Sequence, residues 1–155
     1  MQSLSQNLRL LTMALFASLI PLGAVADDAD DVLAVVQKWA ELESDLEAQA
    51  ALVTDDRIQV FEMWRRADQA QNLRVQLAKR AATRKLDPDW DVIVTIEAPI
   101  VRVYGDDAAV VSFKRMYEVI PGNAAPRPLY QTYISMTLIK ERGVWKIAHM
   151  HGSTD

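Results

Sequence analysis

Cysteine is absent from this chain of 155 residues, and histidine occurs only twice. Without cysteine the protein can have no disulfide framework, no thiolate nucleophile and no cysteine-ligated metal site. Glycine is also scarce, with five residues. None of these glycines forms a loop that cradles phosphate groups or the glycine-flanked serine of a nucleophile elbow. The sequence therefore lacks the motifs of the common catalytic classes.

An excess of basic residues is lacking as well, because 17 lysines and arginines face 21 acidic residues and give a net charge of −4. Proteins that bind nucleic acid neutralise its phosphates with surplus basic side chains. We therefore expect no nucleic-acid partner. The basic cluster within residues 79–85 is interpreted as the solvated face of a helix.

Long apolar runs are missing except near the start of the chain. Residues 1–26 carry a single charge at Arg9, followed by an apolar run of 11 residues that ends at Ile20 and by Ala24-Val25-Ala26. A positive start, a short apolar core and small residues before the cut are typical of a signal peptide, and a spanning helix needs roughly 20 apolar residues. We expect cleavage after Ala26, a periplasmic or secreted protein, and no membrane association afterwards. Residues 27–155 would then form a single domain.

Helical patterns fill the first part of that domain. Apolar residues recur every three or four positions across residues 28–47, which predicts an amphipathic helix. Residues 48–53 are compatible with a short second helix, 54–56 with a turn, and 57–64 with a short strand. Residues 67–84 are rich in strong helix formers and predict another long helix.

The rest of the chain alternates between apolar and polar residues, which predicts strands. We expect four, at 90–104, 108–120, 129–140 and 144–151, with a bend or bulge at Pro99, which cannot donate a ladder hydrogen bond. Helices followed by a strand meander predict an α+β domain, with the helices packed on one face of an antiparallel sheet.

Arg115 is the most informative charged residue in the predicted strands. It shares a strand face with Val111, Phe113 and Tyr117, and this face is the more apolar one, which should meet the helices. A buried cation costs several kcal/mol unless it is paired. Arg115 therefore requires either an ion pair with an internal acid, such as Glu97, or a cavity where water or an anionic ligand compensates its charge.

The two histidines, His149 and His151, lie near the end of the chain, at every second position after Trp145 and Ile147. A strand would place all four on one face. Such a pair could bind a metal, although no further ligand is nominated by its spacing, or act with a carboxylate in proton transfer. The third interpretation is structural, with both imidazoles in a sheet surface or subunit interface.

The second half of the domain resembles a known family. The elements that match are Pro99 followed by alternating residues, the turn at residues 105–109, Arg115, and the ending Gly143-x-Trp145-Lys146-x-x-His149-x-His151-x-Ser153. They are similar to the association (hub) domain of calcium/calmodulin-dependent protein kinase II and, more widely, to the nuclear-transport-factor-2-like and SnoaL-like superfamily.

This resemblance implies a cone-like fold, in which a strongly curved sheet wraps around the N-terminal helices and encloses a pocket, and it implies dimers formed through the sheets. In the hub domain, arginines line the pocket and can hold a small carboxylate. Arg115 matches one of them, whereas Met136 and Gly152 stand at the other two positions and Leu77 stands near a pocket histidine. The resemblance therefore predicts a more apolar cavity with one cation. It also places the histidines on the outer face, unless a bulge reverses the last strand.

These observations predict an exported homodimer, or a higher homo-oligomer, that binds a small, partly apolar molecule, with or without a carboxylate group, and needs no cofactor or metal. The predicted ligand-binding residues are Arg115, Tyr117, Tyr130, Met136, Trp39 and Trp64, with His149 and His151 as alternatives. One other interpretation is an isomerase, dehydratase or cyclase that uses histidine or tyrosine for proton transfer. Another is a module that serves only oligomerisation.

Overall fold

The protein is described by a computed structural model, which covers residues 24–125 and 127–154. The predicted signal peptide, residues 1–26, lies almost wholly outside the described residues and stays a prediction. The helices are α1 (Ala24–Glu41), the short 3-10 helix η1 (Leu42–Ser44), α2 (Leu46–Ala50) and α3 (Gln69–Leu86). The strands are β1 (Val53–Phe61), β2 (Trp64–Arg66), β3 (Asp91–Tyr104), β4 (Ala108–Ile120), β5 (Tyr130–Glu141) and β6 (Val144–Ser153).

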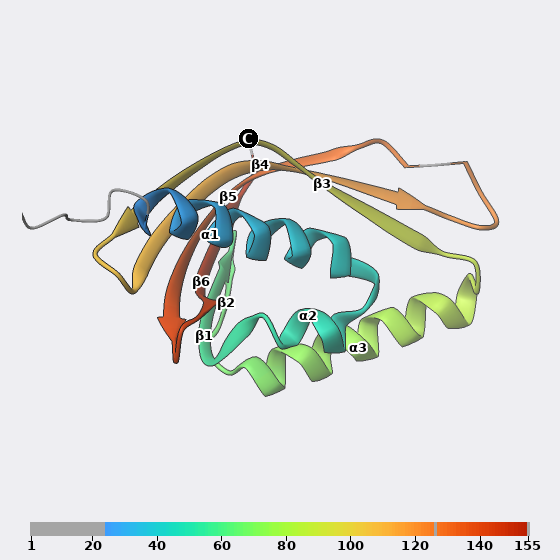
Figure 1. The fold of residues 1–155 in the computed structure, drawn as a ribbon. Coiled ribbons are helices and arrows are strands. Elements are labelled where there is room, and N and C mark those ends of the chain that lie inside the picture. The colour runs from blue at the N-terminus through green and yellow to red at the C-terminus, as the bar shows by residue number, and fades with distance from the viewer. Residues whose placement is uncertain (1–23, 126, 155) are drawn as a thin grey trace, which may run out of the picture.

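The strands form one six-stranded sheet in the order β2-β1-β6-β5-β4-β3. The predicted meander is confirmed, because β3, β4, β5 and β6 pair antiparallel in chain order. The sequence did not predict that β1 would add to the far side of β6 as a parallel neighbour. The α+β class and the curved sheet are as expected, and Figure 1 shows the sheet arching over the helices.

The predicted turn at residues 54–56 is wrong, since these residues belong to β1. Thr54 is 2 % exposed, and next to it Val53 lies opposite Ile147 of β6. The backbone N–H of Ile147 also donates to the carbonyl of Leu52 at 2.9 Å. A run of threonine and aspartate is typical of turns, but pairing with a strand almost a hundred residues away overrides that preference.

Helix α3 begins and ends at local signals. The side chain of Asp68, at its N-cap, accepts a hydrogen bond from the backbone N–H of Gln71 at 2.8 Å. At the other end the backbone N–H of Asp87 donates to Thr83, and Pro88 follows, where the helix cannot continue. The helix predicted for residues 67–84 is therefore confirmed, shifted by two residues.

Three irregularities interrupt the strand pairing, and one of them lies in β1 between Val53 and Ile58. The predicted bulge at Pro99 is confirmed by a register shift between Glu97 and Ile100, with Ala98 at a φ of 49°. A second shift lies in β6, where Ile147 pairs with Leu138 but the next partnered residue is His149. Bulges of this kind increase strand bending and twist, which gives the sheet the concave face that holds both the core and the pocket.

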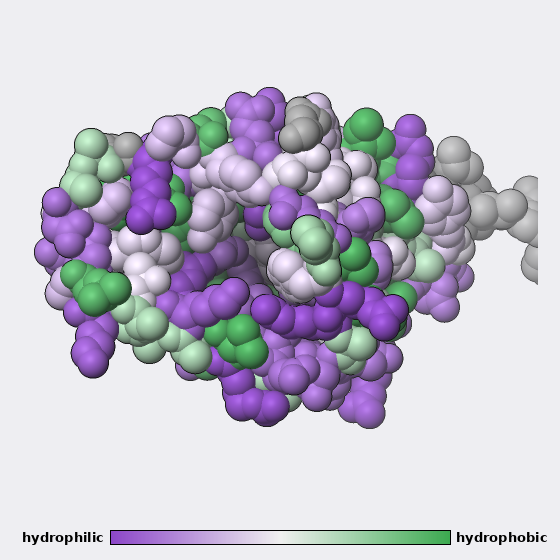
Figure 2. All heavy atoms as spheres, turned by 180° about the vertical axis from the view of Figure 1, so that it is seen from behind, coloured by the Kyte–Doolittle hydropathy of each residue, from purple (hydrophilic) through white to green (hydrophobic). Residues whose placement is uncertain are grey.

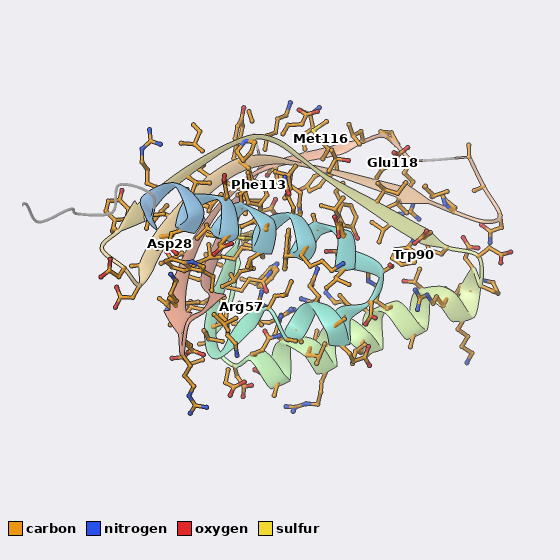
Figure 3. The ribbon with its side chains drawn as sticks, in the orientation of Figure 1. Asp28, Arg57, Trp90, Phe113, Met116 and Glu118 are labelled. Atoms are coloured by element: carbon orange, nitrogen blue, oxygen red, sulfur yellow. The ribbon has the colours of Figure 1, made fainter. Side chains whose placement is uncertain are left out.

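The apolar core lies on this concave face, and α1 packs against β3, β4 and β6 (Figure 1). Figure 3 shows Arg57 and Trp90 on the helix side of the sheet, whereas Met116 and Glu118 lie on its outer side. The buried residues of the core cluster are Val32, Val36, Trp39, Ala40, Val53, Ala109, Val111, Phe113, Ile134, Met136, Leu138, Trp145, Ile147 and Met150.

Candidate functional site

A pocket opens between the sheet and α3, where the apolar core ends. It has a cavity volume of about 290 Å³. Seen from the side opposite to Figure 1, the surface is hollowed near its middle, and hydrophilic residues border much of the hollow (Figure 2). We call this cavity the cone pocket. Its lining residues are Trp39, Glu43, Gln49, Arg57, Gln59, Gln76, Lys79, Arg80, Thr83, Trp90, Arg115, Tyr117 and Met150.

The cone pocket carries a surplus of positive charge. Arg57, Lys79, Arg80 and Arg115 contribute cations to its lining, and Glu43 contributes the one carboxylate. The protein as a whole is acidic, so the surplus is local. Clustered charge of one sign in a cleft raises the concentration of oppositely charged small molecules there.

Arg57, on β1, is the most deeply buried of these cations, with 5 % of its surface exposed. Its Nη2 donates to the side-chain oxygen of Gln59 at 2.7 Å, and its buried Nε has no hydrogen-bond partner. No carboxylate of the described residues forms an ion pair with it. Burial, and then the charge of Arg66, lower the pKa of Arg57 to about 10, so the guanidinium remains a cation at neutral pH.

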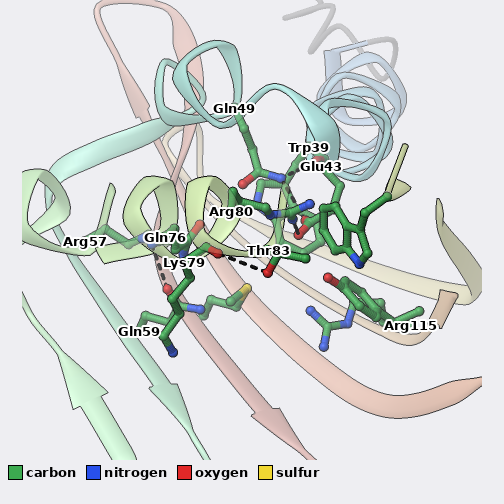
Figure 4. Close-up of a pocket in the computed structure, with 13 residues that line it drawn as sticks. Trp39, Glu43, Gln49, Arg57, Gln59, Gln76, Lys79, Arg80, Thr83 and Arg115 are labelled. Atoms are coloured by element: carbon green, nitrogen blue, oxygen red, sulfur yellow. Dashed lines mark hydrogen bonds and ion pairs between the residues drawn. The ribbon is translucent and has the colours of Figure 1, made fainter. Parts of the chain in front are cut away.

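Arg115, on β4, lies on the other side of the same pocket (Figure 4). Its Nε donates to Oγ1 of Thr132 at 3.1 Å, and its guanidinium carbon is 5.4 Å from the ring centre of Phe61 and 5.2 Å from that of Tyr117. Within the described ranges it too forms no ion pair, since Glu97 instead lies 3.9 Å from Lys114. Burial lowers the pKa of Arg115, and Glu43 partly opposes that shift.

The third arginine, Arg80 of α3, is neutralised. Its Nη2 donates to Glu43 at 2.6 Å, and both side chains are mostly buried. Glu43 also accepts a hydrogen bond from Gln49 Nε2 at 3.1 Å. The guanidinium of Arg80 stacks on the ring of Trp90 at 4.8 Å, and its Nη1 is buried without a partner.

A second cavity, of about 270 Å³, adjoins the cone pocket and shares Gln59, Lys79 and Arg115 with it. It adds an aromatic wall, because the rings of Phe61 and Trp64 stack with their centres 5.8 Å apart.

The predicted site residues are only partly brought together. Arg115, Tyr117 and Trp39 line the cone pocket, and Trp64 lines the adjoining cavity. Met136 is 1 % exposed and belongs to the core instead. Tyr130 is 43 % exposed and its hydroxyl lies 3.1 Å from Glu62, outside the pocket.

The histidines do not line the pocket. A bulge in β6 lies between Ile147 and His149. Before the bulge the buried residues are Trp145 and Ile147, and after it the next buried residue is Met150, so the histidines no longer share a face with Trp145 and Ile147. His151 is exposed and His149 is half-buried. The expectation that all four share one face is therefore wrong, whereas the histidines do lie away from the pocket.

The expectation of a more apolar cavity with one cation is also wrong. Leu77 lies outside the pocket lining. A side chain at Gly152 would begin 2.5 Å from the ring of Phe61, so this position is filled by the aromatic ring and offers no space for a cation. Besides Arg115, the positive charge comes from Arg57 on β1 and from Lys79 and Arg80 on α3. The prediction that residues 79–85 form a solvated helix face is therefore wrong for Arg80, whose side chain is mostly buried.

The described part of the chain shows neither a metal site nor a membrane-spanning helix. It contains no group of three or more histidine, aspartate or glutamate side chains arranged to hold a metal ion. Within residues 24–125 and 127–154, no helix is both long and apolar enough to cross a bilayer.

Several solved structures share the fold. The hub homology domain from Chlamydomonas reinhardtii is 24 % identical, with a TM-score of 0.64 over 83 % of this chain and 98 % of that one. The association domain of the C. elegans kinase is 19 % identical, with a TM-score of 0.64 over 84 % and 98 %. A putative scytalone dehydratase from Novosphingobium aromaticivorans is 11 % identical, with a TM-score of 0.71 over 85 % and 87 %.

No curated protein matches this sequence. One family profile matches residues 28–155 of the sequence, which is nearly all of the described chain. The profile is that of the calcium/calmodulin-dependent protein kinase II association domain, and the neighbours include proteins named as nuclear-transport-factor-2-like with a cystatin-like fold. This chain belongs to the calcium/calmodulin-dependent protein kinase II association domain family.

Proposed function

We propose that this chain is an exported, self-associating domain that binds a small, partly apolar organic anion, such as a carboxylate, in the cone pocket. The observation that carries the proposal is the guanidinium of Arg57, which is 5 % exposed, lines the pocket and forms no ion pair. Leaving a buried charge uncompensated costs several kcal/mol. A ligand anion would supply the missing charge.

The shape and the walls of the pocket support a small ligand with an apolar body. Its volume of about 290 Å³ lies near the lower end for small-molecule sites, which are mostly apolar with a few convergent polar groups. The rings of Trp39, Trp90 and Tyr117 offer apolar contact beside the cations. A carboxylate could accept charge-assisted hydrogen bonds from Arg115 or Arg57, which are roughly twice as strong as neutral ones.

The test is a comparison of acids with their uncharged amides. Benzoate and butyrate should raise the melting temperature and bind in calorimetric titrations, whereas benzamide and butyramide should not. Arg115→Gln should weaken carboxylate binding at least tenfold, and Arg84→Gln, on the exposed side of α3, should leave it unchanged. Equal binding of acids and amides, or no binding of any carboxylate, would contradict the proposal.

Self-association is proposed from the family and from the outer face of the sheet. The family is named for its association domain, and partly exposed apolar side chains lie on the outer face of three neighbouring strands. They are Ile93, Ile100 and Tyr104 of β3, Val110 of β4, and Tyr133 of β5. Light scattering at micromolar concentration should give a dimer or a larger assembly, and a monomer would refute this part of the proposal.

Export is proposed from the sequence alone. The N-terminal sequence of the protein recovered from its own cells should begin at Asp27, in the periplasm or the medium. An intact Met1 in the mature protein would contradict the predicted cleavage.

An enzymatic function remains the second candidate, because one hydroxyl in the pocket could transfer a proton. The ring of Tyr117 lies 5.2 Å from the guanidinium of Arg115. Burial raises the pKa of Tyr117, which suits a proton donor better than a base. Proton exchange on a ketosteroid-type substrate that is abolished by Tyr117→Phe would favour this function. Exchange that survives the change would exclude Tyr117 as the proton donor, and absence of exchange in the parent protein would contradict an isomerase function.

A further inference from the structure

The cone pocket has two positively charged ends rather than one. Figure 4 shows Arg57 and Arg115 on opposite sides of the pocket, with Arg80 and Glu43 between them. Both outer arginines line the same cavity. They come from different strands, β1 and β4, which are separated in the sheet by β6 and β5.

At the Arg57 end, the need for an anion comes from burial and from neighbouring charge. The Nε atom of Arg57 is buried without a hydrogen-bond partner. The side-chain oxygen of Gln59 is its neutral acceptor. Arg66 adds like charge nearby, and its own Nη1 donates to Asn72 at 2.8 Å, which is also neutral. No group of the described chain brings negative charge to this end.

At the Arg115 end, the partners are likewise neutral. Thr132, which accepts from Nε, is 1 % exposed and carries no charge. The aromatic faces of Phe61 and Tyr117 interact favourably with a cation but do not neutralise its charge. This end therefore presents a second cation that an anion could reach.

The carboxylate of Glu43 cannot neutralise both Arg57 and Arg115. It forms an ion pair with Arg80 and accepts from Gln49, and it acts on Arg115 only at longer range, where it partly opposes the lowered pKa. Its charge cancels that of Arg80, and the two outer arginines remain. A ligand with one acidic group can pair with one of them only.

We infer that the ligand of the cone pocket carries two acidic groups, one for Arg57 and one for Arg115, and is a small dicarboxylate. This inference rests on the proposed binding of an organic anion and specifies its chemical class. The middle of the ligand would lie against Tyr117 and Met150, which favours a short apolar chain between the two carboxylates.

The test uses diacids and the monoamides made from them. Calorimetric titrations with succinate, glutarate, adipate and suberate find the best chain length, and the same titration is repeated with the monoamide of that diacid. The two ligands have the same shape and differ by one charge. The diacid should bind at least tenfold more tightly than its monoamide.

Single substitutions at the two ends sharpen the test. Arg57→Gln and Arg115→Gln should each reduce binding of the diacid to the level that the monoamide shows with the parent protein. Arg57→Lys, which keeps the charge, should retain part of the diacid preference, and Arg84→Gln should retain all of it. Circular dichroism checks that each variant is folded. If Arg57→Gln does not fold, the inference is tested by the affinities of the parent protein for the diacid and the monoamide, and by diacid binding to Arg115→Gln.

The possible outcomes separate the inference from the proposed function. Equal affinity for the diacid and the monoamide would overturn the two-anchor inference while leaving an anion site in place. Loss of diacid preference in only one of the two variants would also overturn it. Binding of neither ligand to the folded parent protein would overturn the proposed function together with the inference.

Discussion

The side chains on the concave face of β4 change from apolar to polar halfway along the strand. Ala109, Val111 and Phe113 are at most 2 % exposed and pack in the core, whereas Arg115 and Tyr117, at the same strand alternation, line the cone pocket. The backbone pairing with β5 continues unbroken through both stretches, whereas the pairing with β3 is interrupted at Phe113, opposite the bulge at Pro99. The difference therefore lies in what covers the strand.

Helix cover accounts for the change. Helix α1 packs on β3, β4 and β6, and its contacts seal the apolar stretch, while α3 packs mainly on β1 and α2 and leaves space over the other end. The sealed region stabilises the fold by burying apolar surface. The open region holds buried cations that weaken the fold, and such groups are typical of functional sites that trade stability for binding.

The sharpest way to expose the difference is a truncation in the core. Leu138→Ala should lower the free energy of unfolding by about 2–5 kcal/mol, because Leu138 is fully buried and the lost side chain leaves a cavity. Urea denaturation measures the change. Leu86→Ala, at a leucine that is 82 % exposed, is the matched control and should change it by less than about 0.5 kcal/mol. Similar losses in both variants would refute the assigned core.

Gly152→Ala tests the boundary between the two regions. The new methyl carbon would lie 2.5 Å from the ring of Phe61 and 2.8 Å from Ile134. Relieving this overlap should cost roughly 1–3 kcal/mol of stability. Ser153→Ala, at the exposed neighbouring position, should have little effect in the same denaturation experiment. An unchanged stability of Gly152→Ala would show that Phe61 does not fill this space.

Replacing Arg57 with methionine should not lower the free energy of unfolding, in contrast to a truncation in the core. The change removes a buried cation without an ion-pair partner, so the free energy of unfolding should stay the same or rise by about 1 kcal/mol. Carboxylate binding should fall at the same time. A loss of more than about 2 kcal/mol in the denaturation of Arg57→Met would mean that this arginine supports the fold.

The smallest effect should appear at the start of α1. Hydrogen bonds from Lys140 and then Trp145 hold the pKa of Asp28 below its usual value of 3.8. Its contribution to stability is thus complete above about pH 4 and is lost as the pH falls through the lowered pKa of the folded state. Asp28→Asn should be less stable than the parent at pH 7, and the difference in stability should be smaller at pH 3. A difference that is equal at both pH values would contradict this.

Most of the fold follows from local patterns in the sequence. The alternation of apolar and polar residues predicted β3, β4, β5 and β6 with nearly correct bounds, because each of these strands pairs with the next one along the chain. The error at Thr54–Asp56 arose where a strand depends on a distant partner. Those residues lie in β1 between Val53 and Ile58, which pair with Ile147 and His149 of β6, and no local signal in the sequence indicates that pairing.

The same division explains which site residues could be predicted. Arg115 was found because it interrupts an apolar strand face, which is a local signal. Arg57 sits in a polar stretch of β1 and Arg80 in a basic helix, so nothing nearby marked either as buried. Burial alternates only after Arg57, with Ile58 exposed and Gln59 buried, and this short pattern becomes informative only once β1 is known to pair with β6.

A crystal structure of the protein grown with a small dicarboxylate such as glutarate would show whether Arg57 and Arg115 hold the two ends of one ligand. One carboxylate should lie within hydrogen-bond distance of the guanidinium of Arg57 and the other within hydrogen-bond distance of Arg115, with Arg80 still paired to Glu43. An empty cone pocket in crystals that hold glutarate at saturating concentration, or an acidic side chain of the protein itself paired with Arg57, would contradict this.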